Sequence, residues 1–519
     1  MNMYEILIGS SLVLCIVYVS VCMWRRRKLK SPPGPEGYLF CGNSFQINSD
    51  RLHQDLHVLS EEYGPIFKLN IFGKTIITLS SASLINEAFG TSPTMEFTND
   101  RAANSTSDVF YGRKHIGCAN WCKTTQVLRE IHSILIQKYF ENEPNFEIRI
   151  MDEIRRLQNN LMNDQNTAIN PDTHLRRYFK NLCSILLIGE SLSDIDPETD
   201  APWEFVDSLF TMIEPSVDGA LRMFPFLRYL PGYYGNVFRE TMTARDKVGK
   251  RFFHDLKDTY CPKLRRGIVD ACIYRQQEDI AKTGSSLITD EHIKGLIYDT
   301  LTAGMTELLK TIRLFILLMC HHQDIQTRLQ SEVDSIIGSE RHPTCSDRNW
   351  MPYTQAVTLE IFRYGSQTPL AIPHKCKKDV NINGYLVQTG SAIISNLYAV
   401  HHDEHIWGDP WEFRPERFLD KDGYLLPADH IFMKNVIPFS LGLRACPGQD
   451  FARSRVFLTM TSLLQKFRIL PPQNGTVPST DPRLYTRQYP LTEPKFECRF
   501  IPRENPYFYN IFTPMSEYV

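Results

Sequence analysis

One apolar segment, the 32 residues from Glu291 to His322, does most to constrain the fold of this chain. Its hydrophobic residues recur at helical spacing, and only Gly295 and Gly304 interrupt the pattern. A helix that is apolar around most of its surface needs protein on every side. The sequence therefore predicts a long central helix inside a large body in which helices dominate.

Signals for strands are fewer than signals for helices. The stretch GKTIITLS from Gly73 has strand composition, and residues 380–395 contain a hairpin pattern in which Asn383 and Gly384 suit a two-residue turn. Beyond residue 36 we find no low-complexity linker and no internal repeat. We predict a mainly α fold with a minor β-sheet region (α+β), formed as one domain by residues 37–519.

The N-terminus carries an uncharged run from Ile6 to Trp24, followed by the basic cluster Arg25 to Lys30. As a helix the run spans about 28 Å, close to the thickness of a bilayer core. A cleaved secretory signal is the alternative, but no basic residue precedes the run and no small-residue cleavage site is evident. We predict a membrane anchor at residues 1–24, a basic and proline-rich hinge at 25–36, and a cytosolic body.

Charge and cysteine content exclude two classes of protein. The net charge is -2 and the pI about 6.7, so the chain has no overall basic field with which to bind nucleic acid. The 13 cysteines are scattered along a long chain without a CxxC pair. This pattern favours a reducing compartment over a disulfide framework.

The segment FSLGLRACPG, residues 439–448, places a single cysteine in a glycine-rich loop before an apolar helical segment. A thiolate that binds a metal needs little steric bulk around the sulfur, donors that stabilise its charge, and an apolar shield. Phe439, Gly442, Arg444 and Gly448 suit these needs around Cys446, and the helix dipole that follows stabilises a thiolate. A buried structural cysteine in a glycine turn is the alternative.

These five residues resemble the FxxGxRxCxG haem-binding signature of the cytochrome P450 (haem-thiolate monooxygenase) family. The resemblance implies haem b as cofactor, with Cys446 as the ligand of its iron. It extends over nearly the whole chain, from the anchor and the PPGP segment to the cysteine loop. It also implies the helix-rich fold of that family.

Two further motifs appear in the order found in the family. Glu360 and Arg363 have the i, i+3 spacing of a local ion pair, which alone is typical of an exposed helix face. Arg417 lies in FRPERF, which resembles the family's meander motif. The resemblance implies that these three residues form an ion-pair triad beneath the haem pocket.

The resemblance also implies basic and polar contacts to the two haem propionates. Arg101, Trp121, His374 and Arg444 stand at matching positions. Two carboxylates that enter a pocket of low dielectric need such partners. One partner is missing, because the family pattern WxxxR places an arginine where this chain has Thr125, and Arg129 lies one helical turn further.

The central helix departs from the family at the segment DTLTAGMTE, residues 299–307. In the family an acid precedes a threonine here, the acid feeding a proton relay and the threonine helping to hold dioxygen. This chain has Thr306 and then Glu307, and neighbouring helical positions point about 100° apart. Three outcomes are open: Glu307 delivers protons itself, Thr306 acts in a rearranged helix groove, or reduced oxygen escapes as peroxide.

The implied function is insertion of one oxygen atom from dioxygen into a lipophilic small molecule such as a steroid, fatty acid, terpenoid or xenobiotic. The implied electron source is NADPH through membrane-bound NADPH-cytochrome P450 reductase, with cytochrome b5 as a further partner, at the endoplasmic reticulum membrane. The predicted substrate pocket includes Ala303, Thr368, Leu370 and Ile372. Two alternatives stay open: a haem-thiolate isomerase or dehydratase, and a non-catalytic protein that binds lipophiles or haem.

Overall fold

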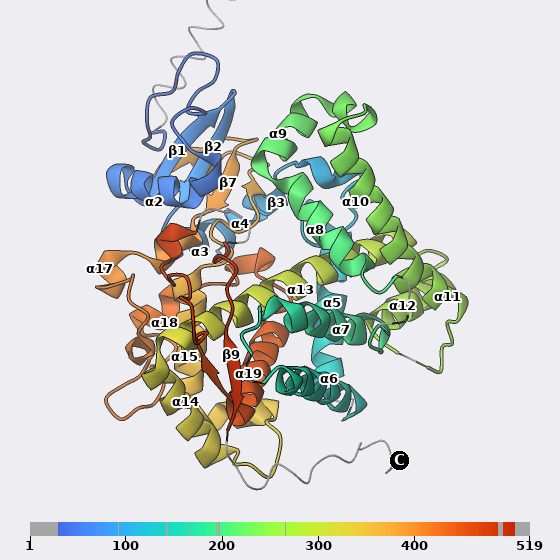
Figure 1. Cartoon of the computed structure of the whole chain (residues 1–519). Coiled ribbons are helices and arrows are strands. Elements are labelled where there is room, and N and C mark those ends of the chain that lie inside the picture. The colour runs from blue at the N-terminus through green and yellow to red at the C-terminus, as the bar shows by residue number, and fades with distance from the viewer. Residues whose placement is uncertain are drawn as a thin grey trace, which may run out of the picture.

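The computed structural model describes residues 30–91, 93–141, 144–165, 167–193, 195, 198–264, 266–485 and 491–503. Helices dominate this part of the chain; β1, β2 and β7 lie at the upper left of Figure 1, and β9 lies near its lower centre. The predicted mainly α architecture with small sheets is confirmed. The α-helices are α2 (Leu52–Tyr63), α3 (Ala82–Phe89), α4 (Met95–Thr98), α5 (Lys123–Glu141), α6 (Pro144–Asn163), α7 (Asp172–Ile188), α8 (Ala201–Ile213), α9 (Pro215–Met223), α10 (Tyr233–Gly249), α11 (Asp255–Asp258), α12 (Ile268–Thr283), α13 (Asp290–His321), α14 (Gln323–Ile336), α15 (Pro352–Gly365), α16 (Leu397–His401), α17 (Glu404–Trp407), α18 (Ile431–Asn435) and α19 (Gln449–Lys466).

The strands of the described residues form one larger and two small sheets. The larger sheet has the order β1-β2-β7-β4-β3, in which β2 and β7 are parallel and the other neighbours antiparallel. The pairs β5-β6 and β8-β9 are antiparallel. The strands are β1 (Ile66–Ile71), β2 (Lys74–Leu79), β3 (Asp100–Arg101), β4 (His374–Lys375), β5 (Val380–Ile382), β6 (Tyr385–Val387), β7 (Ala392–Ser395), β8 (Phe467–Leu470) and β9 (Arg499–Pro502).

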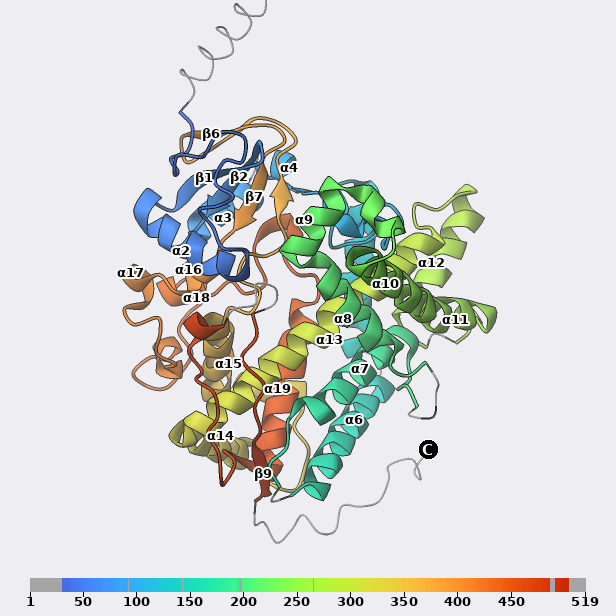
Figure 2. The same cartoon turned by 45° about the horizontal axis from the view of Figure 1, so that its top comes forward.

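The predicted central helix is α13, which crosses the middle of the molecule in both views (Figures 1 and 2). Thr289 begins it with a capping box, in which the Thr289 side chain and the His292 side chain satisfy each other's backbone N–H groups. Helices α7, α15 and α19 pack against it. Because neighbours surround α13, its apolar residues are buried on most of its surface.

The hairpin prediction is confirmed at its turn, where Asn383 and Gly384 have φ angles of 49° and 76°. These left-handed angles are those of the predicted primed turn. The rest of the predicted hairpin segment behaves differently, because β7 leaves the hairpin and joins the larger sheet between β2 and β4.

The described part of the predicted hinge, from Lys30 onward, is extended and attached to the sheets. The carbonyl of Lys30 accepts a hydrogen bond from the N–H of Leu386 at 2.9 Å, and that of Pro33 accepts one from Lys68 at 2.8 Å. Residues 1–29, which contain the predicted anchor and most of the basic cluster, lie outside the described residues. Within the described residues, no helix has the length and hydropathy needed to span a bilayer.

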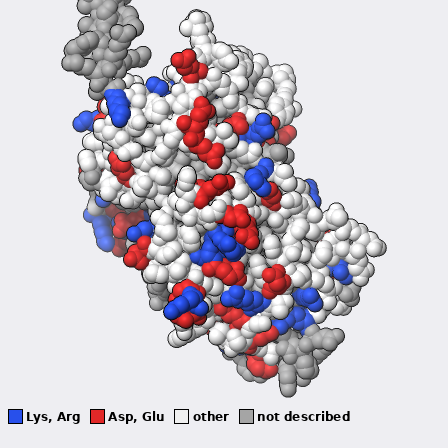
Figure 3. All heavy atoms as spheres, turned by 90° about the vertical axis from the view of Figure 1, so that its left-hand side faces the viewer, with Lys and Arg blue, Asp and Glu red and all other residues white. Residues whose placement is uncertain are grey.

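The face in Figure 3 carries lysine and arginine side chains interspersed with aspartate and glutamate side chains. Neither sign of charge covers that face alone. The arrangement agrees with the net charge of -2.

Candidate functional site

Cys446 lies in the loop between a short 3-10 turn, Gly442–Arg444, and the beginning of α19. Its N–H donates to the Phe439 carbonyl at 2.9 Å, and its sulfur accepts the N–H of Gly448. Gly442 has a φ of 77°, and a Cβ atom there would lie 2.1 Å from the carbonyl oxygen of Phe89. Only glycine therefore lets the cysteine loop lie this close to the end of α3.

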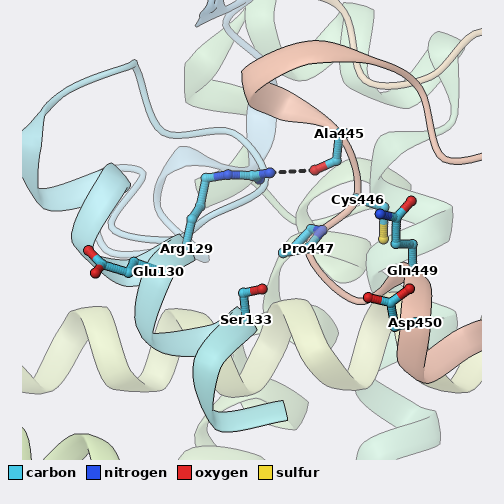
Figure 4. Close-up of a pocket in the computed structure, with 8 residues that line it drawn as sticks. All are labelled: Arg129, Glu130, Ser133, Ala445, Cys446, Pro447, Gln449 and Asp450. Carbon is cyan, nitrogen blue, oxygen red and sulfur yellow. Dashed lines mark hydrogen bonds between the residues drawn. The ribbon is translucent and has the colours of Figure 1, made fainter. Parts of the chain in front are cut away.

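A cavity of about 300 Å³ separates the cysteine loop from α5 (Figure 4). The guanidinium of Arg129, on α5, donates a hydrogen bond to the carbonyl of Ala445, the residue before Cys446. The sequence prediction missed this contact because it counted Arg129 only as a displaced propionate partner. The cavity is lined by Arg129, Glu130, Ser133, Ala445, Cys446, Pro447, Gln449 and Asp450.

The surroundings of Cys446 act on its thiol in opposite directions. Burial raises the pKa of the thiol, and the nearby carboxylates of Glu307 and Asp450 raise it further. The N–H of Gly448 and the positive charge of Arg129 lower that pKa. Glu307, on α13, therefore contributes to the electrostatic environment of the Cys446 thiol.

The predicted ion-pair triad is assembled in the structure, and all three side chains are buried. Arg363 forms a bidentate pair with Glu360, with N···O distances of 2.7 and 2.8 Å. The Nε of Arg417 donates to the same carboxylate at 3.0 Å. The remaining guanidinium N–H groups donate to backbone carbonyls, including those of residues 401, 407, 409, 410 and 412. The buried charges are thus fully hydrogen-bonded.

Three of the predicted propionate partners, two arginines and a histidine, form a buried cluster. Arg101 on β3 is the register partner of His374 on β4, whose ring stacks on Phe89 with centroids 3.7 Å apart. Arg444 donates to the carbonyls of Asn99 and Ile116. Burial, together with the positive charges of Arg101 and Arg129, lowers the pKa of the Arg444 guanidinium to about 9.

Trp121 lies beside this cluster, just before helix α5 begins. Helix α5 begins at Lys123, so Trp121 and Thr125 do not form an i, i+4 pair on one helix face. The Arg444 guanidinium lies over the indole ring of Trp121, with its Cζ atom 5.0 Å from the ring centroid. Thr125 is buried, and its hydroxyl donates to the carbonyl of Asn120 at 2.8 Å.

The residues of α13 around the departure from the family pattern have different surroundings. Ala303 is exposed although most of its helical neighbours are buried, as expected for a residue that lines an internal space. The Thr306 hydroxyl is buried and has no hydrogen-bond partner among the described residues. The Glu307 carboxylate accepts a hydrogen bond from the Thr368 hydroxyl at 3.0 Å. Burial raises the pKa of Glu307, while Lys310 and Thr368 partly offset this effect.

Phe439, Leu370 and Ile372 are the remaining predicted site residues, and each contacts a different part of the fold. The Phe439 ring lies between Phe362 and the guanidinium of Arg453. Leu370 packs in a small apolar cluster with Leu56, Phe67, Leu69 and Ile394, beside the larger sheet. The Ile372 carbonyl accepts a hydrogen bond from Arg101. The side chain of Leu370, predicted to line the substrate pocket, packs in this cluster of the core.

A helical body with small sheets, and a cysteine loop opposite its central helix, define the class of a haem-thiolate protein. The chain belongs to the cytochrome P450 family, because the family model "Cytochrome P450" matches residues 32–497. It is a cytochrome P450 monooxygenase, an oxidoreductase.

Individual relatives are similar over most of their length. Cytochrome P450 2A13 of Homo sapiens is 29% identical over 471 residues, which are 89% of this chain and 93% of the relative. Cytochrome P450 2D10 of Mus musculus is 29% identical over 491 residues, 92% of this chain and 94% of the relative. Cytochrome P450 2A10 of Oryctolagus cuniculus is 28% identical over 499 residues, 93% and 98% of the two chains.

The family implies a haem-thiolate cofactor, and the residues present fit such a group. Burial and the nearby positive charges of Arg101 and Arg129 lower the pKa of Arg444, and such a setting suits an anion with two carboxylates. The Cys446 sulfur already accepts an N–H hydrogen bond and lies at the N-terminus of α19, where the helix dipole favours a thiolate.

Proposed function

We propose that this monooxygenase binds haem b through Cys446 and oxidises lipophilic small molecules with electrons from NADPH. The observation that carries the proposal is the cysteine loop, in which the Cys446 N–H donates to the Phe439 carbonyl just before α19 begins, while Arg101 and His374 pair on adjacent strands. Bound haem would supply dioxygen activation and the transfer of one oxygen atom to the substrate. Residues of this chain would hold the haem, deliver protons and bind the substrate.

Cys446 would be the iron ligand, and its neighbours would hold the sulfur as thiolate. Gly448 and Arg129 act in that direction, and the Arg129 contact to Ala445 fixes the loop. Arg101, Trp121, His374 and Arg444 would bind the propionates. The buried triad of Glu360, Arg363 and Arg417 would keep the loop rigid from below.

Glu307 is the better supported of the two candidates for proton delivery. Its carboxyl has a raised pKa, interacts with Cys446 and receives the hydroxyl of Thr368, so an acid and an alcohol meet at this position from two elements. The buried Thr306 hydroxyl has no hydrogen-bond partner among the described residues, so it has no contact that links it to an acid. We therefore assign proton transfer to Glu307, with Thr368 as its positioning residue.

A lipophilic substrate fits the predicted cavity walls, which include Ala303, Thr368 and Ile372. The reductase and cytochrome b5 would donate electrons, and a membrane location would bring these partners together. Membrane contact is supported by two groups of exposed apolar side chains, in addition to the apolar run at residues 6–24. The exposed residues are Tyr38, Leu39, Phe40, Phe45, Met223, Phe224, Phe226, Tyr229, Leu230 and Tyr233.

The decisive experiment is the spectrum of the reduced, carbon-monoxide-bound full-length protein. A strongly red-shifted Soret band is expected, and it should disappear in Cys446→Ser but persist in Cys261→Ser, which changes an exposed cysteine. Reconstitution with reductase should then consume NADPH in proportion to hydroxylated product. Product without NADPH would favour an isomerase or dehydratase, and ligand-induced spectral shifts without turnover would favour a binding protein.

A further inference from the structure

The loop of residues 108–122 lies directly against the central helix, on the side of α13 that precedes Ala303. A Cβ atom at Gly295 would lie 2.1 Å from the carbonyl oxygen of Lys114, so glycine makes this approach possible. One turn further along α13, Oδ2 of Asp299 accepts the N–H groups of Ile116 at 2.7 Å and Gly117 at 3.0 Å. One carboxylate oxygen thus fixes two successive peptide groups of the loop to the helix.

The second carboxylate oxygen of Asp299 binds a side chain of the same loop. Its Oδ1 lies 2.8 Å from Nδ1 of His115, whose buried ring stacks on Phe110 with centroids 3.9 Å apart. Both oxygens of Asp299 are therefore committed to this loop. The carboxylate acts as the point at which the loop is attached to α13.

The carbonyl groups of the attached peptides hold two arginines of the proposed haem site. The Gly117 carbonyl accepts a hydrogen bond from Nε of Arg101 at 3.1 Å, and the Ile116 carbonyl accepts one from Nη1 of Arg444 at 3.2 Å. The peptide group that joins Ile116 to Gly117 thus donates to Asp299 and accepts from Arg444. Hydrogen bonds that are linked in this way polarise one another, so the carboxylate strengthens the carbonyl as an acceptor.

The hydrogen bonds of Arg444 leave part of its guanidinium available for a ligand. A guanidinium has five N–H groups. Three of those on Arg444 donate, to the carbonyls of Asn99, Ile116 and Ala119. The other two have no acceptor among the described residues, although the side chain is buried. Buried cationic donors of this kind suit an anion.

We propose that Asp299 is a positioning residue for the haem site. Through the peptide groups of residues 116–119 it fixes the guanidinium groups of Arg101 and Arg444, which bind the haem propionates. The inference rests on the proposed function, because it takes haem as the ligand of these arginines. Asp299 acts through the loop and does not bind haem itself.

The proposal is tested on haem-loaded, full-length protein with Asp299→Asn, which keeps the size of the side chain but replaces one acceptor oxygen by an NH₂ donor. The resonance Raman bands of propionate bending should move, because they report hydrogen bonds to the propionates. Transfer of haem to excess apomyoglobin should become roughly tenfold faster. The reduced, carbon-monoxide-bound variant should keep the strongly red-shifted Soret band, because the Cys446 loop is unchanged.

A carboxylate elsewhere on α13 gives the matched control. Asp290 begins the same helix, and its half-exposed carboxylate lies 2.6 Å from Nζ of Lys257. Asp290→Asn removes the same charge from α13 without touching the loop. Both the propionate bands and the rate of haem transfer should stay unchanged in this variant.

Two further variants test whether Asp299 acts through the loop and the arginines. In Gly117→Ala the new Cβ atom would lie 3.1 Å from Oδ1 of Asp299, a tight contact that displaces the carboxylate slightly and alters no charge. It should move the same propionate bands by a smaller amount. Arg444→Gln should speed haem transfer by itself, and Asp299→Asn should add less to this variant than to the unchanged protein.

The proposal is overturned if Asp299→Asn leaves the propionate bands in place, or if the rate increases of Asp299→Asn and Arg444→Gln multiply. Should Asp299→Asn not fold, Gly117→Ala decides, and unmoved bands in that variant overturn the proposal. Failure of the proposed function is recognised separately, because the unchanged protein would then lack the red-shifted Soret band. A normal Soret band with unmoved propionate bands rejects only the role of Asp299.

Discussion

The guanidinium of Arg129 donates a hydrogen bond to the carbonyl of Ala445, the residue immediately before the proposed iron ligand Cys446. The contact joins α5 to the cysteine loop across the cavity in Figure 4. It places a positive charge where it favours a thiolate and fixes one peptide group of the loop. One arginine thus stabilises both the position and the charge of the sulfur.

Replacement of Arg129 should therefore weaken thiolate ligation. In Arg129→Leu, a larger share of the reduced, carbon-monoxide-bound protein should have a Soret band without the strong red shift. Arg129→Lys keeps the charge but loses the planar donor, so its share of unshifted Soret band should lie between those of Arg129→Leu and the unchanged protein. Equal spectra for all three proteins would show that the contact has no part in ligation.

Glu360 should be essential for stability because it holds two buried guanidinium groups. Glu360→Gln leaves Arg363 and Arg417 without their counter-charge and should lower the free energy of unfolding by about 3–5 kcal/mol. The measurement is urea unfolding followed by circular dichroism. Glu416→Gln is the matched control, because its pair with Arg328 is half-exposed and should contribute less than about 1 kcal/mol.

Patterns that are local in sequence were the ones that sequence analysis could predict. The hairpin turn at Asn383, the central helix and the Glu360–Arg363 pair each depend on residues a few positions apart. In each, backbone preference or helical spacing alone determines which groups meet. The cysteine loop was found in the same way, from residues 439–448.

Contacts between distant segments could not be derived from one sequence. Arg129 and Ala445 are 316 positions apart, and His115 and Asp299 are 184 apart. Such contacts depend on how helices and loops pack, which helical periodicity does not specify. Trp121 shows the same limit, because the point at which α5 begins decides which residues share its face.

Reversing the order of the acid and the alcohol on α13 tests the assignment of proton transfer to Glu307. The double variant Thr306→Glu with Glu307→Thr removes the acid from its hydrogen bond with Thr368, so it should form less product per NADPH consumed and release more peroxide. Both quantities are measured in the same reconstituted assay. More product per NADPH would mean instead that the native order limits proton delivery.

The His115–Asp299 pair should make stability depend on pH in a defined direction. The pKa of His115 is about 9 in the folded protein and near 6.5 in the unfolded chain, so its stabilisation is complete below pH 6.5 and is lost as the pH rises through 9. In a Cys118→Ala background, in which the neighbouring thiol cannot titrate, the free energy of unfolding should fall by roughly 2 kcal/mol over this range. Asp299→Asn in the same background should abolish most of that fall.

Two glycines of the cysteine loop should differ sharply when each is replaced by alanine. At Gly442 the new Cβ atom would lie 2.1 Å from the Phe89 carbonyl oxygen, with φ at 77°, so either α3 or the loop must move. At Gly448 no atom of the described residues lies within 4 Å of such a Cβ, and the N–H that binds the Cys446 sulfur remains. Gly442→Ala should therefore lower the free energy of unfolding by several kcal/mol, on the order of 3, and should not retain haem. The free energy of unfolding of Gly448→Ala should lie within about 1 kcal/mol of that of the unchanged protein. Urea unfolding and haem content, measured on both variants, check this difference, and equal losses would mean that the contact with Phe89 does not fix the loop.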